Sequence, residues 1–77
     1  MSDQEKLYAA TAEGLTATRA LAAREGWQPE HLRDIAYDVK VRIIHELNLA
    51  TRATTELQID AAPYLWRLDA LRQLTGY

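Results

Sequence analysis

The sequence predicts a small all-α protein, either a three-helix bundle or a helical hairpin with a short third helix packed across it. Apolar residues recur at helical spacing, and the few glycines and prolines stand between those stretches. With 48% hydrophobic and 26% charged residues, the composition is that of a globular chain. At 77 residues we expect one domain, residues 1–77, with helices near residues 3–24, 29–55 and 60–74.

The first expected helix, residues 3–24, begins with a capping signal and ends at a glycine. Ser2 followed by Glu5 is typical of a capping box. Gly26 stands where a left-handed residue closes a helix. Gly14 falls inside the helix, where it either allows a close backbone approach or is simply tolerated. The expected buried stripe is Leu7, Ala10, Gly14, Ala17 and Leu21.

The second expected helix, residues 29–55, begins at Pro29, because proline is favoured at the first helical position. Trp27, just before it, is expected to pack back as an anchor. One apolar stripe is unambiguous: Leu32, Ala36, Val39, Ile43, Leu47, Ala50 and Leu57. The threonines at positions 51, 54 and 55 are weak helix formers, so the helix is expected to end between Thr51 and Gln58. Alternatively, residues 57–59 form a short extended linker.

The third expected helix, residues 60–74, has Asp60 as its N-cap and Pro63 in its first turn. Its apolar face comprises Tyr64, Leu65, Leu68, Leu71 and Leu74. Trp66 points away from that face and is expected to be partly exposed. Tryptophan is enriched at interface hot spots, so Trp66 is a candidate contact for a partner. The alternatives are a core position or an isolated surface aromatic.

The second expected helix carries a further apolar line, 120–140° away from the first by helical geometry (about 100° per residue). It consists of Tyr37, Val41, Ile44 and Asn48. Two interpretations compete: the line packs against the third helix within one chain, or it forms a two-fold interface with another copy. A short chain without cysteine has a marginal core and no disulfides, which favours the homodimer.

Residues for catalysis or metal binding do not form a recognisable pattern. The HExxH motif begins at His45 but fails at Leu49. His31 and His45 are too far apart on one helix to share a metal, and Asp38 with Arg42 is interpreted as an exposed ion pair. We therefore expect no enzyme activity and no catalytic, cofactor-binding or metal-binding residues.

The charge and hydropathy patterns bear on the partners. A net charge of −2 without a basic cluster argues against nucleic acid, and no apolar run reaches the length of a membrane span. A cytoplasmic location follows by default. We therefore expect a homodimeric interaction module that binds a further protein as an adaptor, inhibitor or regulator. The alternatives are a nucleic-acid-binding transcriptional regulator and a structural subunit of a larger assembly.

Overall fold

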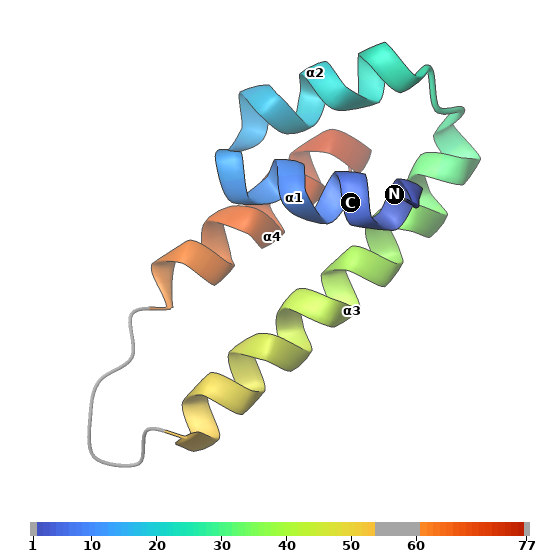
Figure 1. Cartoon of the computed structure of the whole chain (residues 1–77). Helices are drawn as coiled ribbons and strands as arrows, with labels where there is room; N and C mark the ends of the chain where they lie inside the picture. Colours follow the sequence, from blue (N-terminus) through green and yellow to red (C-terminus); the bar gives the residue numbers. More distant parts are fainter. Residues whose placement is uncertain (1, 54–60, 77) are drawn as a thin grey trace.

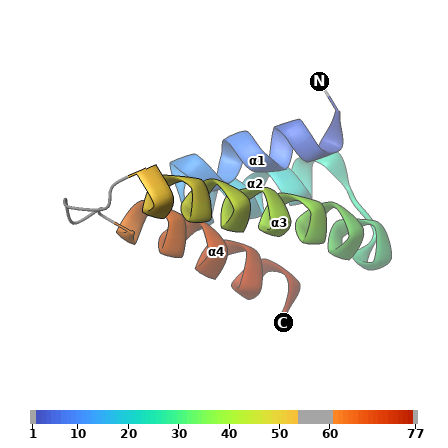
Figure 2. The same cartoon turned by 90° about the horizontal axis from the view of Figure 1, so that it is seen from below.

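The computed structural model describes residues 2–53 and 61–76, and in these two ranges it contains four α-helices. They are α1 (Asp3–Glu13), α2 (Leu15–Glu25), α3 (Pro29–Ala53) and α4 (Ala62–Thr75). Helices α1 and α2 fold back on each other, and α3 and α4 run antiparallel (Figures 1 and 2). The two hairpins pack with α1 against α3 and with α2 against α4. The predicted all-α class is confirmed.

The expected single helix over residues 3–24 is wrong, because the chain reverses at Gly14. This residue has φ 112° and ψ −178°, a conformation that is essentially restricted to glycine. A straight helix of that length would span about 33 Å and carry its second half away from the core. The reversal instead lets both halves bury a face, so that Leu7 and Leu21 are both buried. Tertiary packing therefore outweighs the local preference for one continuous helix.

Most of the other helix ends agree with the sequence signals. The Ser2 hydroxyl accepts a hydrogen bond from the Glu5 amide at 3.2 Å, which caps α1. Gly26 follows α2 in a left-handed conformation, and Gly76 follows α4 in the same way. Pro63 lies in the first turn of α4, as predicted. The expected N-cap at Asp60 is wrong, because α4 begins at Ala62 with Ala61 as its N-cap and without a side-chain cap. The possible linker at residues 57–59 lies outside the described residues.

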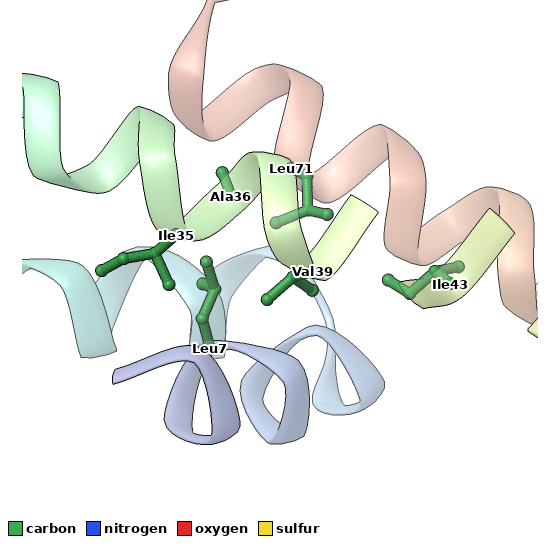
Figure 3. Close-up of a cluster of buried hydrophobic side chains, with 6 residues drawn as sticks. All are labelled: Leu7, Ile35, Ala36, Val39, Ile43 and Leu71. Atoms are coloured by element: carbon green, nitrogen blue, oxygen red, sulfur yellow. The ribbon is translucent and has the colours of Figure 1, made fainter. Parts of the chain in front are cut away.

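The core is built mainly by α3. Four of its side chains meet one leucine from α1 and one from α4 (Figure 3). The six residues are Leu7, Ile35, Ala36, Val39, Ile43 and Leu71. The predicted burial of the first apolar line is confirmed at Ala36, Val39 and Ile43. Trp27 packs against this core from the turn before α3, which confirms its role as an anchor.

Two threonines are buried beside the apolar core, and both satisfy their hydroxyls locally. Thr11 donates to the carbonyl of Tyr8 at 2.7 Å. Thr18 donates to the carbonyl of Gly14, also at 2.7 Å. Because each hydroxyl bonds within its own chain segment, the interface between α1 and α2 stays tightly packed without an unsatisfied polar group at either residue.

Candidate binding surface

Helix α1 lies along the face of α3 that carries His31, Asp38, Arg42 and Glu46. Side chains of α1 pair with it at four levels: Asp3 with His31, Gln4 with Asp38, Glu5 with Arg42, and Tyr8 with Glu46. The expected ion pair between Asp38 and Arg42 is therefore wrong. Arg42 instead contacts the Glu5 carboxylate at 3.1 Å and the Glu46 carboxylate at 3.5 Å. These pairs link α1 to α3 at the surface, since most of their side chains remain exposed.

The polar groups of this interface do not assemble a metal site. Within residues 2–53 and 61–76, no three histidine, aspartate or glutamate side chains come together to hold an ion. The Nε2 atom of His31 lies 2.8 Å from the Asp3 carboxylate, and its ring packs nearly perpendicular to the Trp27 ring at an interplanar angle of 80°. These contacts join α1, α3 and the turn before α3. In the same part of the chain, no helix has the length and apolarity needed to cross a membrane.

The second apolar line of α3 lies on the surface. We call Tyr37, Val41, Ile44 and Asn48 the α3 stripe. The exposed fractions are 65% for Tyr37, 48% for Val41 and 37% for Ile44, and Asn48 is also exposed. Seen from below, α3 lies in front of the other helices (Figure 2). Exposed large apolar side chains in a row are typical of an interaction surface.

A groove of about 650 Å³ runs between α3 and α4 beside the α3 stripe. Its floor is apolar and includes Ala36, Leu68 and Leu71. Tyr37 and Leu65 form its walls, and charged residues stand along its rim. The rim comprises Arg33, Asp34, Lys40, Asp69 and Arg72. Tyr37 therefore belongs both to the groove and to the stripe, which makes the two features one continuous surface.

On the α4 side of this surface, the rim is ordered by local hydrogen bonds. Arg72 donates to one Asp69 oxygen at 2.8 Å, and Gln73 donates to the other at 2.6 Å. The hydrogen bond from Arg72, followed by that from Gln73, lowers the pKa of the Asp69 carboxyl below its ordinary value near 3.8. A negative charge is therefore held in place at the groove edge near neutral pH.

Trp66 lies on α4 but outside the groove. It is 71% exposed, in agreement with the prediction that it points away from the core. By helical geometry it lies about 100° from Leu65, which lines the groove. Of the five sequence-predicted surface residues, the structure thus brings the four of the α3 stripe together on one helix. Trp66 stands on a separate face.

Compared with protein-family models, curated proteins and solved structures, the chain gives no significant match. Any functional argument therefore rests on its own residues.

Sequence reasoning missed the groove and one of its walls. Leu65 was expected on the buried face of the last helix, but its exposed fraction is 55%. Arg67 takes part in the core side of α4 instead, where it contacts α1. The spacing of the leucines could not predict how α4 is rotated about its own axis. Residues 65, 68 and 71 share one broad face, and only packing decides which edge of that face is covered.

Proposed function

We propose that the protein is a non-catalytic interaction module that self-associates through the α3 stripe as a homodimer. The observation that supports this function is the exposed row of Tyr37, Val41 and Ile44 beside an apolar groove. Full burial of a side chain of this size contributes about 1.5–3 kcal/mol. Association offers the chain apolar burial that its own fold leaves unused, which matters for a domain of 77 residues.

The test is the solution mass by light scattering over a concentration series. The native chain is expected to approach twice its mass of 8.8 kDa. Ile44→Asp is expected to abolish association while leaving the helicity intact, because Ile44 is on the surface. Leu49→Asp is the matched control. Leu49 is also an exposed apolar residue of α3, but it lies off the stripe. A dimer that survives Ile44→Asp, or a native chain that remains monomeric at every concentration, would refute the proposal.

The proposal has a second part, a protein partner that the dimer regulates or scaffolds. The feature that supports it is Trp66, whose exposed ring lies on a different helix from the α3 stripe. A dimer formed by the stripe therefore leaves Trp66 open to a further protein. Tryptophan contributes a large contact area at small entropic cost, which suits this role.

A further inference from the structure

The spacing of the α3 stripe indicates what kind of surface covers it. Its four residues follow one another at intervals of four, three and four. This is the a/d spacing by which two helices pack side by side in a coiled coil. The stripe is therefore suited to one long helix lying along it. The longest described helix in the protein, α3 itself, is such a helix.

Resting on the self-association proposed above, we propose that α3 of a second copy packs antiparallel along the α3 stripe. In this arrangement Val41 meets Ile44 of the second copy, and Tyr37 meets Asn48 of the second copy. Each contact occurs twice, as a two-fold axis requires. The centre of the stripe, between Val41 and Ile44, lies close to the middle of α3. Antiparallel helices therefore overlap along nearly their whole length.

Charge along the edges of the stripe favours the antiparallel direction. One edge carries Asp38 toward its N-terminal end and Arg52 toward its C-terminal end. Both are exposed, and the Asp38 carboxylate also accepts a hydrogen bond from Gln4 of α1. Antiparallel packing sets this edge beside the same edge of the second copy, running in the opposite direction. The acidic end of each then lies beside the basic end of the other, which contributes specificity.

Parallel packing would instead bring like residues together. Asp34, which continues the stripe toward the N-terminus of α3, would meet the Asp34 carboxylate of the second copy, and such like-charge contacts are destabilising. Antiparallel packing places Asp34 beside Thr51 of the second copy. In the antiparallel arrangement, Lys40 lies beside Lys40 of the second copy, on the edge opposite Asp38 and Arg52. The flexible stem of each lysine lets its ammonium reach water, so the two charges need not approach each other.

Cysteine cross-linking tests the direction, because the natural chain contains no cysteine. Tyr37→Cys and Asn48→Cys are prepared separately, mixed and oxidised gently. Residues 37 and 48 are about 17 Å apart along the helix, well beyond the reach of a disulfide. The antiparallel dimer is therefore expected to give mainly the mixed disulfide between the two variants, identified by its mass. Each variant alone is expected to give only background cross-linking.

A second pair of variants keeps the test decisive if loss of Tyr37 weakens the dimer. Asp34→Cys and Thr51→Cys remove no apolar contact, and the same mixed disulfide is expected. Self-linked products as the main species would establish parallel packing and overturn the proposal. A dimeric mass with no cross-link in either pair would also overturn it, by showing that another surface associates. A monomeric native chain would instead remove the proposed self-association itself, so the two failures are distinguishable.

Charge reversal provides an independent readout. Arg52→Asp alone is expected to raise the dimer dissociation constant about tenfold, since two attractive contacts become repulsive. The double variant Asp38→Arg/Arg52→Asp is expected to recover most of that loss. Absence of any recovery, in a double variant with native helicity, would contradict the antiparallel arrangement.

Discussion

Arg67 on α4 reaches across to α1, where its guanidinium carbon lies 4.2 Å from the centroid of the Tyr8 ring. The same side chain donates to the Tyr8 carbonyl at 2.9 Å and to the Thr11 hydroxyl at 3.0 Å. On α3, the guanidinium carbon of Arg42 lies 3.7 Å from the same ring centroid. The Tyr8 hydroxyl donates to Glu46 at 2.7 Å. The Tyr8 side chain and backbone thus connect α1 to both α3 and α4.

We expect Arg67→Met to destabilise the fold by about 2 kcal/mol. It keeps the apolar stem but removes two charge-assisted hydrogen bonds and one cation–π contact. Urea unfolding followed by circular dichroism measures the change. Arg72→Ala is the control, since Arg72 is exposed and bonds only locally to Asp69 among the contacts described above. If the two variants lose equal free energy of unfolding, the contacts of Arg67 with α1 contribute no more stability than an exposed ion pair.

Gly14→Ala is expected to cost about 1–3 kcal/mol, because φ at this position is 112°. A Cβ there would meet no atom within 4 Å, so the loss comes from the backbone and not from a clash. The chain is short enough for chemical synthesis, which allows D-alanine at position 14 as the matched control. D-alanine favours positive φ and is expected to lose less stability than L-alanine. The reverse order in thermal unfolding would contradict the backbone explanation.

The lowered pKa of Asp69 predicts an acid-sensitive contribution to stability. A carboxyl whose pKa is depressed by folding contributes stability that is present above its ordinary value near 3.8 and is lost as the pH falls through the folded value. NMR titration is expected to place the pKa of Asp69 below 3.8 in the native chain. Arg72→Ala should move it upward, since Arg72 is the main cause of the shift. A titration unchanged by Arg72→Ala would exclude that cause.

Trp66→Ala is expected to lower the free energy of unfolding by no more than about 0.5 kcal/mol, because the ring is largely exposed. The dimer mass should stay unchanged, since Trp66 lies outside the α3 stripe. Acrylamide quenching provides a direct check: Trp66 in the Trp27→Phe variant should be quenched strongly at every protein concentration. Protection of Trp66 that grows with protein concentration would place it in the dimer interface instead.

Much of the fold could be predicted from the sequence because α3 has a regular apolar period. The positions of Ala36, Val39 and Ile43 on one face follow from that period alone, and their burial is confirmed. The reversal at Gly14 could not be predicted in the same way. A glycine between helix-forming residues fits a long helix equally well, and only the burial gained by folding back decides between them.

The exposed surface likewise has features that the sequence predicts and features that only packing decides. The exposure of Trp66 follows from helical geometry, once the core face is known. The same geometry did not decide the exposure of Tyr37 and Val41, because their line could also have packed against the last helix. The groove required knowledge of how α4 is rotated, which depends on contacts of Arg67 far away in the sequence. The paired face of α3 could not be predicted either, because charged residues at these positions suit water as well as the charged side chains of α1.

The pairing between α1 and α3 also determines the register of α1 along α3. Arg42 is bracketed on its own helix by Asp38 and Glu46, each about one turn away. If α1 slipped by one turn in either direction, Glu5 would lose its cation and face one of these two carboxylates. The position of Arg42 between two carboxylates thus selects one position for Glu5. The hairpin of α1 and α2 therefore has one favoured register along α3. The apolar contact of Leu7 alone would not define this register, because such contacts are not directional.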